Sequence, residues 1–287
     1  MKKFFSFIFG CILFLIVAVG AVGAGGYFYI RETYGIDVIR TVKELKTLGE
    51  PVDETKLCPN AYTLADMVDV QNTVNESVDG FITGTAEHGY QVNFDNLPDS
   101  MLQIIKLTDK QVAALAQEVV EQEIEGKINF GNEKVGVVLK QVDFYDVADK
   151  GACFNVVISV DMTPLKKQSG NEILDYITSL VPDKMYVSST VKVTHGTEAF
   201  SYSVAHEELK INNLTAEDTD DLFHTLGVLF KVDPVEKWNV YVGTTIMNAL
   251  VGNADNKGLA YGLNNIGATD YAFLTEDGKD YFAVLRG

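Results

Sequence analysis

The chain has 287 residues, a formal charge of −17, 47% hydrophobic residues and only six prolines. This composition argues against extensive disorder. All 40 acidic residues and 21 of the 23 basic residues follow Ile30, so the formal charge of that part is −19. Because phosphate contacts need clustered lysine and arginine, we expect no nucleic-acid partner and no tight adsorption to anionic headgroups.

Residues 4–30 form 27 consecutive uncharged and mostly apolar residues. As a helix this run would cover roughly 40 Å at about 1.5 Å per residue, more than the ~30 Å hydrocarbon core of a bilayer. A helix is the expected form, because a lipid-exposed backbone must pair its own polar groups. The run therefore predicts a transmembrane anchor, with the membrane as its partner.

Charge at the two ends of the run predicts its orientation. Lys2 and Lys3 precede it, whereas Arg31 stands beside Glu32 at the far end. The positive-inside rule then predicts a single-pass protein of the cell membrane, with residues 1–3 cytoplasmic and the C-terminal domain extracytoplasmic. The alternative is a signal peptide cleaved at Ala21-Val22-Gly23, although the apolar run continues past that site to Ile30.

Beyond the anchor, residues 31–97 predict a juxtamembrane helix and an irregular, polar approach. Apolar residues recur at near-helical spacing in 31–50, at Ile36, Ile39, Val42, Leu45 and Leu48. Residues 51–97 have no such pattern, but 81–94 resembles a hairpin around His88-Gly89.

A firmer pattern runs from residue 98 to residue 233, which we interpret as the core domain. Thr108-Asp109-Lys110-Gln111 has the signature of a helix capping box, and Val112, Leu115, Ala116, Val119 and Val120 follow as one apolar face. Alternating residues then predict strands at Val135–Leu139, Val156–Val160, Val187–Val193 and Phe200–Val204. A helical patch at 173–180 separates the second and third strands.

Further helices are predicted from Thr215 and, in the C-terminal segment 234–287, after Pro234. That segment ends in a hairpin whose turn is Asp277-Gly278, a strong turn signal between apolar runs. The expected fold class is α+β, with one N-terminal transmembrane helix followed by an extracytoplasmic, largely antiparallel and twisted sheet packed on amphipathic helices.

No catalytic motif is complete. His206-Glu207-Glu208 begins like a zinc-protease helix, but Lys210 stands where the second histidine is needed. Asp218, Asp220 and Asp221 fall in the first turns of a predicted helix, where acids favour the dipole. We therefore expect no enzyme activity, no metal and no cofactor. Cys58 and Cys153 could form one disulfide or remain two thiols.

The phrases "LTDKQVAALAQEVV", "VGVVLKQVDF", "FNVVISVDMTP", "VPDKMYVSSTVKVT" and "FSYSVAHEELKINNL" follow one another between residues 107 and 230. In this order the segment resembles bacterial YpmS-type envelope proteins, which have a single anchor and an extracellular part similar to tubular lipid-binding domains. The resemblance implies binding of a lipid near the membrane. The chain departs from the family in its long insertion before residue 98 and its extra region after Val232.

A curved sheet on a long helix can leave an apolar groove between them. The residues expected to line it are Val112, Leu115, Val119, Val156, Ile158, Val191, Val193, Phe200 and Tyr202. The alternative is that the same side chains close on one another as a dry core. The sequence thus favours a non-enzymatic, membrane-anchored envelope protein that binds a lipid or another apolar ligand. The alternative function is a structural or assembly module that binds envelope proteins through its acidic ectodomain and anchor.

Overall fold

The computed structural model describes Glu32 and residues 35–95, 97–124, 126–130, 133–148, 151–166, 182–230 and 233–287. The predicted cytoplasmic tail, the anchor at 4–30 and the helical patch at 173–180 lie outside the described residues. In the part of the chain that is described, no helix is both long and apolar enough to cross a membrane.

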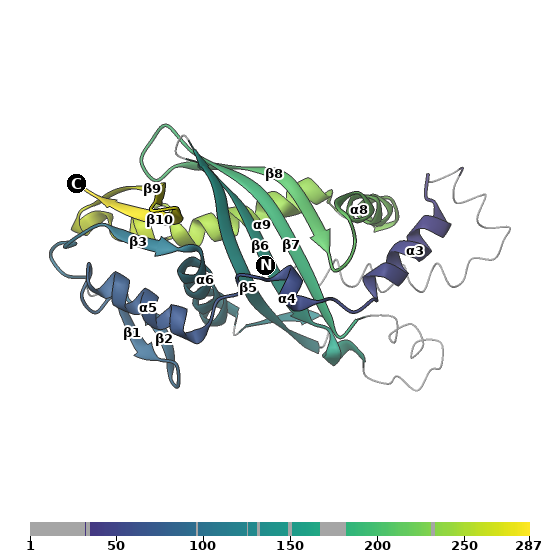
Figure 1. The fold of residues 1–287 in the computed structure, drawn as a ribbon, viewed down its shortest axis with the longest axis horizontal. Helices are drawn as coiled ribbons and strands as arrows, with labels where there is room; N and C mark the ends of the chain where they lie inside the picture. Colours follow the sequence, from purple (N-terminus) through teal and green to yellow (C-terminus); the bar gives the residue numbers. More distant parts are fainter. Residues whose placement is uncertain are drawn as a thin grey trace.

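The centre of the fold is a five-stranded antiparallel sheet in the order β4-β5-β6-β7-β8. Its strands are long and strongly twisted, and helix α9 crosses one face of the sheet (Figure 1). Three of the four predicted strands are confirmed within β5, β6 and β7, because alternating apolar residues face the core. The bounds are β4 Lys127–Phe130, β5 Glu133–Ala148, β6 Gly151–Asp161, β7 Lys184–His195 and β8 Tyr202–Ile211.

The strand predicted to begin at Phe200 begins instead at Tyr202, which corrects the expectation for Phe200. Phe200 lies in a turn and has a φ of 57°. Its backbone N–H donates to Asp270 Oδ1 at 2.9 Å and not to a neighbouring strand. The Asp270 carboxylate therefore takes the place of a neighbouring strand as the partner of this N–H, and the strand does not extend to Phe200.

Three long helices pack around this sheet: α6 Asp109–Ile124, α8 Ala216–Phe230 and α9 Val235–Leu250. The predicted capping box of α6 is confirmed, since Thr108 N–H donates to Gln111 Oε1 at 2.9 Å and Gln111 N–H donates to Thr108 Oγ1 at 3.4 Å. Helix α8 is capped in a similar way, with Asp218 N–H donating to Thr215 Oγ1 at 3.1 Å. The helices predicted after Thr215 and Pro234 are thus present.

The C-terminal segment completes a second, three-stranded sheet in the order β3-β10-β9. Its hairpin turns at Asp277 and Gly278, whose φ angles of 52° and 73° suit the predicted tight turn. Because β10 pairs with β3 and α9 packs on β7 and β8, the segments 98–233 and 234–287 share one hydrophobic core. The bounds are β3 Ile105–Thr108, α10 Leu259–Gly262, η2 Asn264–Ile266, β9 Ala268–Glu276 and β10 Lys279–Arg286.

The segment before residue 98 is more ordered than the sequence predicts. The helix predicted within 31–50 is present as α3, Val38–Leu48, and the hairpin as β1, Ile82–Thr85, and β2, Gly89–Val92. The expectation of an otherwise irregular approach is wrong, because α4, Glu54–Leu57, and α5, Leu64–Asn75, fold within it. Met67, Val70 and Val74 of α5 are at most 2% exposed, so this helix is part of the core. A short helical turn, η1, Thr163–Lys166, follows β6.

Candidate functional site

The residues predicted to line an apolar groove lie mostly inside the core. Val112, Leu115, Val156, Ile158, Val191 and Val193 are at most 8% exposed and belong to one hydrophobic cluster. Phe200 and Tyr202 are half-buried and pack against that cluster. Val119 lies in α6, but its side chain lies outside what the structure describes. Val156, Ile158, Val191 and Val193 lie on one face of the sheet and pack in the core.

Helix α9, and not the helix that begins after Thr108, covers the β7–β8 part of that face. Gly243 allows this close approach. A Cβ at position 243 would lie 2.7 Å from Val191 Cγ2 and 2.8 Å from Val204 Cγ1. Helix α6 packs instead beside β5.

A buried polar cluster joins α9 to the sheet one turn before Gly243. Asn239 and Ser189 are both fully buried. Asn239 Nδ2 donates to Thr190 O at 2.6 Å, Ser189 Oγ donates to Asn239 Oδ1, and His206 Nδ1 lies 2.7 Å from Asn239 Nδ2. The register of β7 and β8 shifts between Thr190 and Val191, where these bonds form. The cluster therefore fixes the helix against the irregular part of the sheet.

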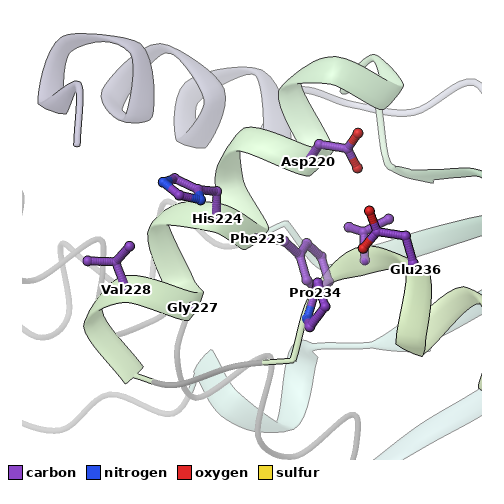
Figure 2. A pocket seen from close by; sticks show the side chains of 8 residues that line it. Asp220, Phe223, His224, Gly227, Val228, Pro234 and Glu236 are labelled. Atoms are coloured by element: carbon purple, nitrogen blue, oxygen red, sulfur yellow. The ribbon is translucent and has the colours of Figure 1, made fainter. Parts of the chain in front are cut away.

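A pocket lies between α8 and the start of α9, with a volume of about 400 Å³. This volume falls in the range of small-molecule sites. The carboxylates of Asp220 and Glu236 lie on the same side of the pocket, and the ring of Phe223 lies between the two helices (Figure 2). Apolar side chains and two carboxylates thus line one cavity. Its residues are Asp220, Phe223, His224, Gly227, Val228, Pro234, Val235 and Glu236.

Electrostatics in this pocket favour a cation. Burial, and next the charge of Glu236, raise the pKa of the Asp220 carboxyl, while His206 acts in the opposite direction. The two acids repel each other, and a bound cation would relieve this repulsion. Phe223 and Val235 are at most 3% exposed and give the cavity an apolar floor. The arrangement suits a group that is apolar at one end and positively charged at the other.

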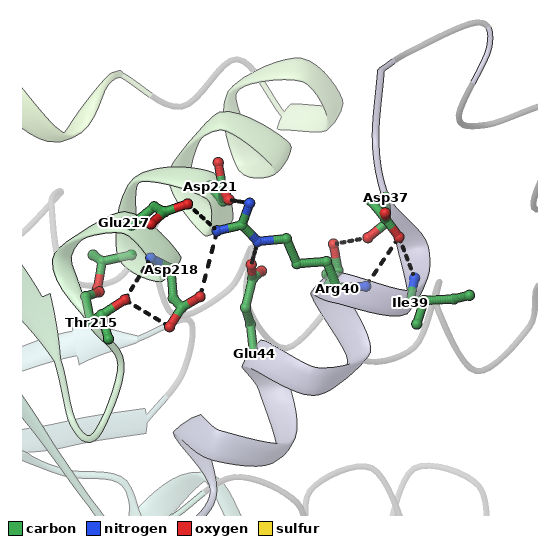
Figure 3. A network of polar contacts seen from close by, with 10 residues as sticks. Asp37, Ile39, Arg40, Glu44, Thr215, Glu217, Asp218 and Asp221 are labelled. Carbon is green, nitrogen blue, oxygen red and sulfur yellow. Dashed lines mark hydrogen bonds and ion pairs between the residues drawn. The ribbon is translucent and has the colours of Figure 1, made fainter.

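A second polar cluster lies on the same helix, where α8 contacts α3 (Figure 3). Arg40 of α3 contacts four carboxylates: Glu44 at 3.1 Å, Glu217 at 3.3 Å, Asp218 at 3.5 Å, and Asp221. Burial, together with the charges of Asp221 and Asp218, raises the pKa of Glu44 to about 7 against the lowering effect of Arg40. This cluster attaches α3 to α8.

Two histidines, His195 and His206, contact polar side chains of other elements, and Cys58 and Cys153 do not form a disulfide. His195 Nε2 lies 3.0 Å from Asp270 Oδ1, and His206 contacts Asn239. Among the described residues, no group of three or more His, Cys, Asp or Glu side chains could hold a metal ion. Cys58 and Cys153 are both free thiols in the structure, and burial raises the pKa of Cys58 to about 11. Neither thiol has the lowered pKa of a nucleophile.

Comparisons of the chain with protein-family models, with curated proteins and with solved structures give no match. The resemblance to YpmS-type envelope proteins therefore stays a prediction. The case for a function rests on the geometry of the sites described above.

The sequence contained a signal for half of the pocket. Asp220, Phe223, His224, Gly227 and Val228 follow the spacing of one helix face, which mixes acidic, aromatic and aliphatic side chains. From the sequence alone, the position of Asp220 indicates only a favourable interaction with the helix dipole, and no pattern singles out Phe223. The other half could not be found, because Pro234 and Glu236 face α8 only after the chain has turned between the two helices.

Proposed function

We propose that this protein is a membrane-tethered, extracytoplasmic binding module without catalytic chemistry. Its ligand is an amphipathic molecule with an apolar body and a cationic head, held in the pocket between α8 and α9. The single observation that carries this proposal is the pairing of an apolar floor, Phe223 and Val235, with the carboxylates of Asp220 and Glu236. Two neighbouring carboxylates select for positive charge, and the apolar floor selects against small hydrated cations.

The position of the pocket supports a ligand that is found close to the membrane. Helix α8 lines the pocket and also holds α3 through Arg40. Helix α3 begins at Val38, eight residues after the apolar run ends at Ile30. The pocket therefore belongs to the part of the domain that is tied most closely to the proposed anchor. A lipid with an amine head group has the chemistry that the pocket selects.

The apolar groove expected between the sheet and a long helix remains a prediction, and it differs from the pocket because its lining is buried. Val156, Val191 and Val193 are fully buried, so a ligand could reach them only if α9 moved away from the sheet. Such a movement would expose the buried amide of Asn239 and would cost the packing around Gly243. The open pocket needs no such movement.

The experiment compares three ligands with the same six-carbon chain: hexylamine, hexanol and hexanoate. Binding to the full-length chain in nanodiscs is measured by saturation-transfer NMR at pH 7.5. Hexylamine is expected to bind best and hexanoate least. The double change Asp220→Asn and Glu236→Gln should weaken hexylamine binding about tenfold, since two charge-assisted contacts are lost. Binding should also weaken as the pH falls through the raised pKa of Asp220, because protonation removes a carboxylate charge.

Asp255→Asn is the matched control, since this exposed acid lies in the loop after α9 and outside the pocket. It should leave hexylamine binding unchanged. Equal binding of hexanoate and hexylamine, or unchanged binding in the double variant, would refute the proposed ligand chemistry. A basic protein segment that binds through the acidic surface, but fails to compete with hexylamine, would favour the assembly-module alternative.

A further inference from the structure

The exposed face of α3 carries two apolar side chains and two lysines. Ile39 is 68% exposed and Val42 is 47% exposed, and Lys43 and Lys46 are exposed beside them. Side chains spaced three, four and seven positions apart lie on one face of a helix, so these four side chains form a single strip. We refer to Ile39, Val42, Lys43 and Lys46 as the α3 strip.

The rest of α3 is used to hold it in the fold. Thr41, Glu44 and Leu48 are at most 3% exposed. Arg40 extends toward α8, whereas Ile39 points away from it (Figure 3). Within the described residues, Lys43 and Lys46 form no ion pair. The strip is therefore separate from the contacts that attach the helix.

The charge of α3 is opposite to that of the part of the chain that follows Ile30. The helix contains Arg40, Lys43 and Lys46 but only one acid, Glu44, in a part of the chain whose formal charge is −19. Arg40 is surrounded by carboxylates, so Lys43 and Lys46 carry the positive charge that faces outward. A helix face with exposed lysines and aliphatic side chains is typical of helices that lie in the interface of anionic membranes.

We propose that the α3 strip lies on the membrane surface, where Lys43 and Lys46 bind anionic phospholipid headgroups and Ile39 and Val42 enter the interface. This inference rests on the proposed membrane tether. It refines the expectation from the net charge, because salt screens charges beyond about 8–10 Å and the headgroups respond to the nearest side chains. The acidic surface farther away still prevents adsorption of the whole domain.

The chain length allows this contact. Val38 is eight positions after Ile30, so α3 begins at most about 28 Å from the end of the apolar run, even with a fully extended connection. A tether this short gives the strip a high local concentration at the bilayer. Two lysines and two aliphatic side chains, which would bind weakly on a free protein, are then enough for lasting contact.

Ile39→Trp introduces a fluorescent reporter at the centre of the strip, and the natural Trp238 of α9 supplies the background in the parent chain. The full-length variant is reconstituted in vesicles with brominated acyl chains, either of phosphatidylcholine alone or with added phosphatidylglycerol. Quenching of the added fluorescence is expected in the anionic vesicles. It should fall at least about twofold in zwitterionic vesicles, in high salt, or with Lys43→Glu and Lys46→Glu. Lys257→Glu with Lys279→Glu is the control, since both lysines are exposed at other sites.

Flotation of the vesicles separates the tether from the strip. A chain that floats but shows no quenching in anionic vesicles would overturn the membrane contact of α3 and leave the tether intact. A chain that does not float would overturn both proposals. Protection of the added tryptophan that rises with the protein-to-lipid ratio, without bromolipid quenching, would mean that a second copy covers the strip and would also overturn the proposal.

Discussion

Two residues of α9, Gly243 and Asn239, determine how the helix meets the sheet. Gly243 leaves room for Val191 and Val204, whose methyl groups would collide with any larger side chain. Asn239 provides a donor and an acceptor at a point where the strand register shifts. An apolar residue at position 239 would leave the hydroxyl of Ser189 and the carbonyl of Thr190 without this partner. Buried polar groups that lose a partner carry the full cost of desolvation.

Asn239→Ala should therefore lower the free energy of unfolding by about 2–4 kcal/mol, from the lost hydrogen bonds and the small cavity. Urea denaturation followed by circular dichroism measures the change. Thr244→Ala on the same helix is the control, because Thr244 is half-buried and its hydroxyl has no hydrogen-bond partner among the described residues. It should change the unfolding free energy by less than about 0.5 kcal/mol. Equal effects of the two variants would show that the Asn239 cluster has no special role.

At the scale of elements, α3 and α8 are joined by a charge cluster that responds to pH. Glu44 is 3% exposed, and burial raises its pKa to about 7. That value already includes the lowering effect of Arg40 and the raising effect of Asp221 and Asp218. Because the docked state favours the protonated carboxyl, docking gains stability as the pH falls. This contribution is fully present below the ordinary glutamate pKa and is lost as the pH rises through about 7.

Hydrogen exchange of the α3 amides, corrected for the intrinsic rate, should therefore slow between pH 8 and pH 5. Glu44→Gln should remove most of this pH dependence, since the neutral amide stays uncharged at both values. Glu217→Gln should retain it, because the Glu217 side chain is 82% exposed. A pH dependence that is unchanged in the Glu44→Gln variant would assign the effect to another group.

Elements whose signals are local could be predicted from the sequence. The capping box at Thr108 and Gln111 and the turn at Asp277-Gly278 each involve neighbouring residues, and both are confirmed. Helix α5 was missed because its core face consists of only Met67, Val70 and Val74 among polar residues. The pairing of β10 with β3 could not be predicted, because it joins residues such as Phe282 and Leu107, about 175 positions apart. The pocket depends on a non-local arrangement of the same kind.

At the scale of the whole molecule, the candidate sites gather at one end. Helices α3 and α8 lie at one end of the five-stranded sheet, and β3, β9 and β10 lie toward the other (Figure 1). The pocket, the α3 strip and the pH-sensitive cluster all belong to α3, α8 or the start of α9. A tether before α3 would hold this end toward the bilayer. The acidic charge of the domain would keep the remaining surface soluble.

The central claim is that the chain stays tethered with its domain outside the cytoplasm. The most direct test expresses the full chain with a C-terminal epitope in bacteria and combines carbonate extraction with protease treatment of intact spheroplasts. We expect the full-length, 31.6 kDa chain in the carbonate-washed membranes, with its epitope removed by external protease. A shortened chain in the soluble fraction, or a membrane-bound chain whose epitope is cut only after lysis, would contradict the account.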